Sequence, residues 1–285
     1  MEQTNIIKAI INFVNNPVSK LKEYSESQNR ANSMGGALEE YIKDIFANTV
    51  NEKDIVARNK QISQCFSYLG NQNNPPDSII RGGDAIEVKK IQNLTSGIAL
   101  NSSYPKAKLF STSKMITKAC KVCEDWDTKD IIYIIGVVKK NVLSNMCMIY
   151  GVDFAASEEI YLRIKKAIRK GVNSIQGIDF AETKELGRVN KIDPLGITYL
   201  RIRGMWGMSN PLKVYEYIYQ RDKNKDLNFM ALINDEKYAS FDNDDRLLLE
   251  QLAQTVQNLN ITDVEIYTPD NPAQLKKAKL ITYCV

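Results

Sequence analysis

Residues 73–91 read NNPPDSIIRGGDAIEVKKI and predict two strands joined by a tight turn. Proline cannot donate to a strand ladder, so the chain enters extended at Pro76 rather than as part of a central strand. The turn falls at Gly82-Gly83, where a positive φ costs little. The second strand, residues 85–91, then follows directly, and the stretch predicts a β-hairpin.

The charged side chains of this hairpin form a pattern. Successive side chains of a strand point to opposite faces, so Glu87 and Lys89 share one face while Ile86 and Val88 share the other. Asp77 stands at the head of the partner strand. The hairpin therefore predicts a compact cluster of two acids and one base.

This cluster suits phosphodiester hydrolysis with Mg²⁺, which prefers hard oxygen ligands and keeps several waters. We expect Asp77, Glu87 and the backbone carbonyl of Val88 to bind the metal. A bound divalent ion polarises the phosphate and activates water, and Lys89 would orient or deprotonate that water and offset developing charge. Asp84 is a second metal candidate, ranked lower because its parity places it opposite Glu87.

Pro76-Asp77 and Glu87-Val88-Lys89 together resemble the PD-(D/E)XK nuclease signature. In such folds a helix often carries a glutamate toward the metal, and Glu39 in a predicted helix over residues 37–47 matches that pattern. The alternatives are a solvated hairpin whose charges form a surface ion pair, and a Glu39 that only favours its helix N-terminus.

Composition limits the function classes. The chain has 285 residues, no histidine and a net charge of +4. Lack of histidine excludes Ser-His-Asp and Cys-His hydrolases and leaves carboxylates, lysine and magnesium as the catalytic means. No apolar run approaches the length of a membrane span and no signal peptide is recognisable, so we expect a cytoplasmic protein with no membrane association. Five cysteines, an odd number, predict reduced thiols, with Cys120 and Cys123 as neighbours on one helix face.

The order of apolar segments predicts an α/β (α+β) protein. Helical periodicity marks residues 5–15, 37–47, 113–126, 158–170 and 242–259, and strand-length runs mark residues 55–69, 131–138, 146–154, 214–219, 229–233 and 263–267, the last before a polar tail. We predict a PD-(D/E)XK restriction-endonuclease-like core with a mixed central sheet flanked by helices. Residues 1–155 would hold this catalytic core, and residues 156–285 a C-terminal α+β region for DNA recognition or dimerisation.

Basic side chains suggest where DNA would bind. Arg201 and Arg203 share a face of a predicted strand, and arginine is the usual bidentate reader of guanine. Lys106 and Lys108 lie in a polar loop after the hairpin, and Arg30 lies in a polar segment that is either a solvated connector or a DNA-facing segment. Arginines that simply point into water remain the alternative for the strand.

Several further stretches resemble one family, the NgoPII-type type II restriction endonucleases. They are residues 29–32 (NRAN), 37–41 (ALEEY), 67–71 (SYLGN), 74–91, 100–103 (LNSS) and 199–206 (YLRIRGMW). The resemblance runs through most of the chain and is densest between residues 29 and 155.

The resemblance implies a Mg²⁺-dependent endonuclease that cuts duplex DNA at a short palindrome, in that family 5′-GGCC. It supports Asp77, Glu87 and Lys89 as catalytic and assigns no base-reading residues. A palindrome calls for a homodimer with twofold symmetry. A cognate DNA methyltransferase belongs to the same system, with no direct contact implied. The alternatives are a structure-specific or repair nuclease on the same core, and a non-catalytic DNA-binding protein with a nuclease-like fold.

Overall fold

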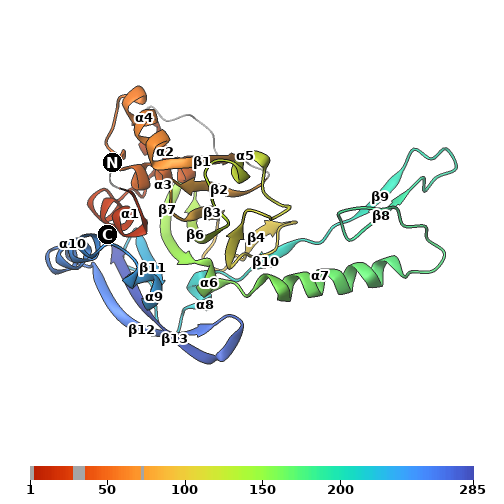
Figure 1. Ribbon diagram of the computed structural model, residues 1–285. Helices are drawn as coiled ribbons and strands as arrows, with labels where there is room; N and C mark the ends of the chain where they lie inside the picture. Colours follow the sequence, from red (N-terminus) through yellow and green to blue (C-terminus); the bar gives the residue numbers. More distant parts are fainter. Residues whose placement is uncertain (1–2, 28–35, 72–73) are drawn as a thin grey trace.

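A mixed β-sheet runs through the centre of the computed structural model, which describes residues 3–27, 36–71 and 74–285 (Figure 1). In the described residues the sheet has nine strands. Eight follow one another in the order β1 (Phe66–Asn71), β2 (Asn74–Ile80), β3 (Ala85–Ile91), β6 (Thr128–Lys139), β7 (Val142–Tyr150), β11 (Asn228–Asn234), β13 (Asn271–Cys284) and β12 (Asn260–Thr268), and β5 (Lys108–Phe110) pairs with β6. The pairs β3/β6 and β7/β11 are parallel, whereas β2/β3, β6/β7 and β11/β13 are antiparallel. The predicted mixed sheet is confirmed.

The central strands are apolar because both of their faces are covered. All residues of β11 are buried, as are most of those in β6 and β7. Such uninterrupted apolar runs are typical of strands with no solvent-facing side. The predicted strands over residues 131–138 and 229–233 are confirmed.

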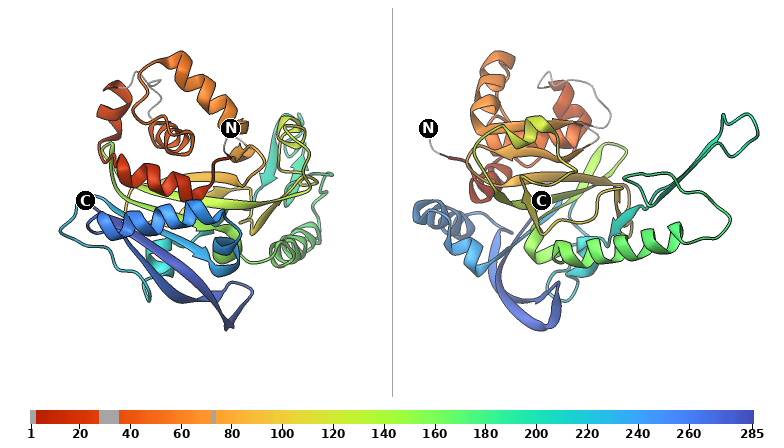
Figure 2. Two further views of the ribbon diagram at one scale, coloured as in Figure 1. Left: turned by 60° about the vertical axis from the view of Figure 1, so that its left-hand side comes forward. Right: turned by 45° about the vertical axis from the view of Figure 1, so that its right-hand side comes forward.

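Helices cover one face of the sheet (Figure 2). They are α1 (Ile6–Asn15), α2 (Leu21–Ser27), α3 (Ala37–Ala47), α4 (Ile55–Cys65), α9 (Asp235–Ala239) and α10 (Asn243–Thr255). Helix α1 starts at Asn5, whose side chain accepts a hydrogen bond from the Lys8 N–H at 3.0 Å. Its apolar stripe packs on the sheet, and the Phe13 ring lies 4.7 Å from that of Phe229 in β11. These helices confirm the predicted flanking layer.

Short elements and loops cover the opposite face. They include α5 (Lys118–Lys121), α6 (Gly151–Phe154), α8 (Pro211–Val214) and a two-stranded sheet of β4 (Ile98–Asn101) and β10 (Trp206–Met208). Ile98, Ile116 and Tyr215 from these segments are buried against the sheet. This second apolar layer is the face on which Glu87 and Lys89 lie.

An arm extends from the body of the molecule (Figures 1 and 2). We define the arm as residues 157–206, which contain α7 (Glu158–Asn173), β8 (Gly187–Asn190) and β9 (Tyr199–Ile202). All residues of the arm are described, and Gly187 alone among them is buried. The arm therefore has almost no core of its own.

Five secondary-structure predictions are wrong. The predicted strand over residues 146–154 ends at Tyr150, and residues 151–154 form helix α6. Residues 55–65 are helical because Asp54 accepts the Val56 N–H at 2.8 Å and caps the helix, so only residues 66–71 form a strand there. Between residues 113 and 126 only Lys118–Lys121 is helical. Residues 214–219 form the end of α8 and a turn. The polar tail is β13, whose exposed half pairs with β12.

The division of the chain at residue 156 stays a prediction. Strands β11, β12 and β13 come from the C-terminal part and continue the same sheet as β1–β7. Among the described helices none is long and apolar enough to span a lipid bilayer.

Candidate active site

The predicted hairpin forms, and it brings the predicted acidic and basic side chains together. Strands β2 and β3 pair antiparallel with Ser78 opposite Ile86, and the turn between them contains Gly82 with φ +66°. Ile86 and Val88 are buried against the helical layer. Glu87 and Lys89 consequently lie on the opposite face of β3.

Asp77 lies next to Glu87 across the two strands. Its Oδ2 accepts a hydrogen bond from the backbone N–H of Val88 at 2.6 Å. Burial, the largest influence, raises the pKa of Asp77, while the positive charge of Lys89 and the Val88 N–H act in the opposite direction. The carboxylate is thus fixed by the backbone of the neighbouring strand.

Glu87 is the most deeply placed acid of the cluster. Its Oε1 pairs with Lys89 Nζ at 2.5 Å, and its Oε2 is buried with no hydrogen-bond partner among the described residues. Burial and, secondly, the charge of Asp77 raise the pKa of Glu87 to about 7. A buried acceptor without a partner is rare and requires an explanation.

Lys89 remains a cation in this setting. Burial disfavours its charged form, but the negative charges of Glu87 and Asp77 outweigh burial and raise the pKa of Lys89. One partly exposed ammonium therefore lies beside two carboxylates, as the sequence predicted. The roles of all three residues stay predictions.

Glu39 approaches the cluster from the first turn of α3. Burial, followed by the charge of Asp77, raises the pKa of Glu39, while Lys43 and Lys89 lower it. Glu39 is thus near enough to Asp77 and Lys89 to interact with them, and its role at the site stays a prediction.

The oxygen atoms of this cluster match the ligand preferences of Mg²⁺. Two carboxylates and a backbone carbonyl are hard donors, and the partnerless Oε2 of Glu87 is an acceptor that a cation would satisfy. Among the described residues, no three His, Cys, Asp or Glu side chains converge closely enough to form a complete metal cage. The donor set therefore fits a cation that retains water ligands rather than an all-protein site.

Lys106 is a neighbour of Glu87 that the sequence assigned to DNA contact. It is buried, its Nζ lies 4.4 Å from the centre of the Tyr104 ring, and its backbone N–H donates to Tyr133 Oη at 2.8 Å. Burial lowers the pKa of Lys106, against the opposing charges of Glu158 and Glu87. Its burial close to Glu87 could not be read from the sequence, because Tyr133, which helps to cover it, lies 27 residues further along the chain.

Asp84 is engaged elsewhere. Its Oδ2 accepts from Tyr150 Oη at 2.7 Å, and its Oδ1 pairs with Lys237 Nζ at 2.8 Å. Lys237 also pairs with Asp130 at 2.8 Å. Asp84 therefore belongs to a separate ion cluster, which accords with its lower rank as a metal ligand.

The predicted DNA-contacting arginines lie on the arm. Arg201 in β9 and Arg203 just beyond it both pair with Glu185, at 2.5 Å and 2.6 Å. The hydrogen bond from Arg201, the largest influence, lowers the pKa of Glu185 to about 2. Lys108 is partly exposed and pairs with Asp130 at 3.5 Å, and Arg30 lies outside the described residues.

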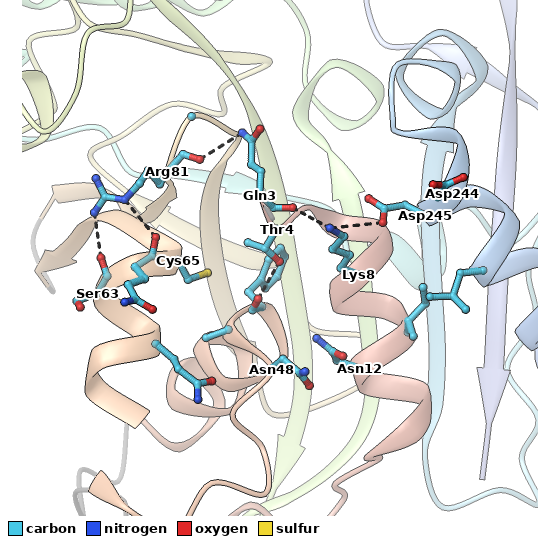
Figure 3. Close-up of a pocket in the computed structure, with 17 residues that line it drawn as sticks. Gln3, Thr4, Lys8, Asn12, Asn48, Ser63, Cys65, Arg81, Asp244 and Asp245 are labelled. Atoms are coloured by element: carbon cyan, nitrogen blue, oxygen red, sulfur yellow. Dashed lines mark hydrogen bonds and ion pairs between the residues drawn. The ribbon is translucent and has the colours of Figure 1, made fainter. Parts of the chain in front are cut away.

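A large cavity lies away from these side chains (Figure 3). It has a volume of about 1060 Å³ and opens between α1, α4 and α10, where Lys8, Arg81 and Asp245 line it. Lys8 pairs with Asp245, and Arg81 donates to the carbonyls of Ser63 and Phe66. Its charged groups thus serve the contacts between these elements.

Comparison with known proteins gives consistent matches. A sequence model of the family described as "NgoPII restriction endonuclease" matches residues 4–267. The chain is 56% identical over 282 residues to the "Type II restriction enzyme NgoPII" of Neisseria gonorrhoeae, an alignment covering 98% of this chain and 99% of that protein. No solved structure matches the chain.

Proposed function

Because the chain belongs to the NgoPII restriction endonuclease family, we propose that it is a type II restriction endonuclease, which cleaves double-stranded DNA at a specific sequence. The finer proposal is Mg²⁺-dependent hydrolysis at a short palindrome, 5′-GGCC, by a homodimer. The cluster of Asp77, Glu87 and Lys89 would be its active site.

One observation carries this assignment. Glu87 is a buried carboxylate that has one oxygen on Lys89 and the other without a partner in the described part of the chain, and Asp77 lies beside it. Burying a carboxylate in this way costs free energy unless a cation or a donor compensates it. Such a costly arrangement is typical of a functional site.

Each residue then has a distinct role. Asp77, the Oε2 of Glu87 and the carbonyl of Val88 would hold the cation, which supplies charge stabilisation and an activated water when bound. Lys89, kept protonated by its two acidic neighbours, places positive charge where negative charge develops on the phosphate. Glu39 would add negative potential beside Asp77.

The arm supplies the positive potential for DNA. It carries ten Lys and Arg against six Asp and Glu, a net charge of +4, which equals the net charge of the whole chain. The rest of the protein is therefore balanced, so attraction to phosphates concentrates on the arm. Arg201 and Arg203 have the chemistry to read the guanines of the proposed site.

Digestion of plasmid DNA with Mg²⁺, followed by sequencing of the fragment ends, tests the proposal. Discrete fragments ending within 5′-GGCC are expected. A smear, or cuts that depend on junctions or damage, would favour the repair nuclease. Duplex binding without cleavage, in either Mg²⁺ or Mn²⁺, would favour a non-catalytic DNA-binding protein.

Variants test the site itself. Glu87→Gln and Lys89→Ala are each expected to lower the cleavage rate by about 10²-fold or more while duplex binding persists. Glu265→Gln and Lys277→Ala, on the exposed β12–β13 hairpin, are the matched controls and should cleave normally. Cleavage retained by both active-site variants would refute the assignment.

A further inference from the structure

Exposed apolar side chains are concentrated on the arm, whose 50 residues hold nearly half of the large ones that are exposed in the described part of the chain. Eleven large apolar side chains of the arm are exposed: Leu162, Ile164, Ile168, Ile175, Ile178, Ile192, Leu195, Ile197, Tyr199, Leu200 and Met205. At about 100 Å² for a fully exposed side chain, they present on the order of 600 Å² of apolar surface. The largest apolar patch of a typical monomer covers about 300–600 Å² and is often functional, so the arm exposes enough apolar surface for an interaction site.

Two parts of this surface differ in shape. The base of the arm contains a groove of about 370 Å³, lined on its apolar side by Ile164, Ile168, Leu186, Met205 and Trp206. We call it the arm groove. The far end of the arm is the loop between β8 and β9, which we call the arm tip (Figure 1).

The arm tip is convex and apolar. Leu195 is 84% exposed, Ile197 74% and Ile192 55%. The loop is nevertheless well ordered internally, because the Asp193 carboxylate accepts hydrogen bonds from the backbone N–H groups of Ile197 and Thr198. A rigid apolar tip loses little conformational entropy when it is buried.

We propose that two copies of the chain associate through their arms, with the arm tip of each copy seated in the arm groove of the other. This inference rests on the proposed function, since a palindromic target calls for twofold symmetry. A twofold axis makes the contact reciprocal: whatever the tip of one copy contacts, the other tip contacts too.

Surface area and reach support this pairing. A standard interface buries about 800 Å² on each partner, and the exposed apolar side chains of the arm could supply about three quarters of that area. A helix of 16 residues such as α7 is about 24 Å long. The tip and the groove of one chain lie at opposite ends of the arm, so only another chain can bring them together.

Charge is compatible with this pairing. Lys165, Lys184, Arg203 and Glu185 line the arm groove, which gives its rim a net charge of +2. The tip carries Lys191 and Asp193, and the pKa of Asp193 is lowered to about 2 mainly by its hydrogen bond from Thr198, so it stays ionised. The acid of the tip can therefore lie against the basic rim of the groove.

The arm is also joined to the active site. Glu158 accepts a hydrogen bond from Tyr104 Oη, and the Tyr161 ring stacks on the Tyr104 ring at 5.8 Å. Lys106 lies over the same Tyr104 ring and interacts with Glu87. Pairing of the arms would thus fix the separation of two active sites.

Sedimentation of the full chain tests the proposal. The wild type is expected to be a dimer, and Leu195→Asp at the tip and Ile168→Asp in the groove are each expected to give a monomer. Leu275→Asp, at a side chain 51% exposed on the β12–β13 hairpin, is the matched control and should remain a dimer. A monomeric wild type, or a dimer in either arm variant, overturns the proposal.

A cross-link provides a test that does not depend on disrupting the protein. The arm has no natural cysteine, so Leu195→Cys combined with Met205→Cys places one thiol at the tip and one in the groove. A short bis-maleimide should join two chains in the double variant and not in either single variant. Failure to join them, or joining in the Leu195→Cys variant alone, overturns the contact between tip and groove.

The two proposals can fail separately. A dimer that depends on the arms but does not cut 5′-GGCC would refute the proposed function and leave the arm interface intact. If the arm variants remain dimers but lose duplex binding, the arm binds DNA and not a second copy.

Discussion

At the scale of single residues, burial decides which of the predicted side chains can act together. The alternation of residues 85–91 predicted that Glu87 and Lys89 share a face, and the strand bears this out. The same reasoning placed Lys106 in a polar loop, whereas Tyr104 and Tyr133 cover it. Local sequence carries the period of a strand but not the identity of residues that fold over a loop from a distance.

Lys106→Met should separate stability from activity. Methionine keeps the length of the buried side chain and removes its ammonium group. Because burial lowers the pKa of that group and so disfavours its charged form, we expect an unchanged or higher melting temperature. Cleavage should fall about tenfold, because a positive charge near Glu87 is lost. Circular dichroism melting and single-turnover cleavage check the two effects. Lys277→Met, on the exposed β12–β13 hairpin, is the control, and equal cleavage by both variants would contradict a role for Lys106 at the site.

The ion cluster of Lys237 with Asp84 and Asp130 predicts a pH dependence of stability. Burial opposes ionisation of Asp130, but the hydrogen bond from Lys237 outweighs it and lowers the pKa of Asp130 below its ordinary value of 3.8. The resulting stabilisation is fully present at pH values above this ordinary pKa and is lost as the pH falls through the lower pKa of the folded state.

Lys237→Met should remove this stabilisation. It leaves Asp84 buried without its cation, and we expect the free energy of unfolding at pH 7 to fall by about 3 kcal/mol. The free energy of unfolding of Lys237→Met should also fall less steeply between about pH 5 and pH 2 than that of the wild type. Urea unfolding at several pH values measures both, and parallel pH profiles for the two proteins would refute the expectation.

At the scale of elements, those with a regular apolar pattern were predictable from the sequence, and those without one were not. Helix α3 has the predicted bounds, 37–47, because its apolar stripe and preceding glycines are local signals. Helix α4 was mistaken for a strand because it buries only Arg58 and Ile62 and so lacks a clear apolar period. Half of β13 is exposed and polar, and its strand conformation depends on pairing with β12.

Gly70 in β1 tests how closely this strand supports the active site. A Cβ at Gly70 would lie 2.4 Å from the carbonyl oxygen of Pro76 and 2.9 Å from that of Asp77. Gly70→Ala should therefore displace β2, lower the free energy of unfolding by about 1–3 kcal/mol and reduce cleavage. Gly171→Ala in α7 meets no atom within 4 Å and is the control. Normal activity of Gly70→Ala would show that Asp77 tolerates the shift.

At the scale of the whole molecule, charge and apolar surface are both concentrated on the arm. The body is electrically balanced and has two packed apolar layers, whereas the arm carries the net charge and has one buried residue. The sequence showed the basic and apolar residues of α7, but it did not show that the arm extends away from the body. The arm extends because few elements of the body pack against its apolar side chains, and local sequence carries no signal of such missing packing.

The salt dependence of DNA binding should therefore reside in the arm. Lys166→Ala combined with Lys170→Ala on α7 should weaken duplex binding for all sequences and reduce the slope of log K against log salt by about 2, one for each lost phosphate contact. Lys223→Ala combined with Lys277→Ala removes the same charge from the body. Fluorescence anisotropy at several salt concentrations compares them, and equal slopes for the two double variants would contradict the assignment.

The pairing of Arg201 and Arg203 with one glutamate has a consequence for fidelity. For a protein that reads bases with these arginines, any DNA must first compete with Glu185 for their guanidinium groups. The correct base pair offers an arginine two acceptors in one plane, so its hydrogen bonds replace the ion pair with Glu185. A different base pair offers fewer acceptors, so the arginine stays paired with Glu185. Glu185 would thereby compete with DNA bases for the two guanidinium groups. This competition would make the enzyme discriminate more strongly against sites that differ from its target by one base pair.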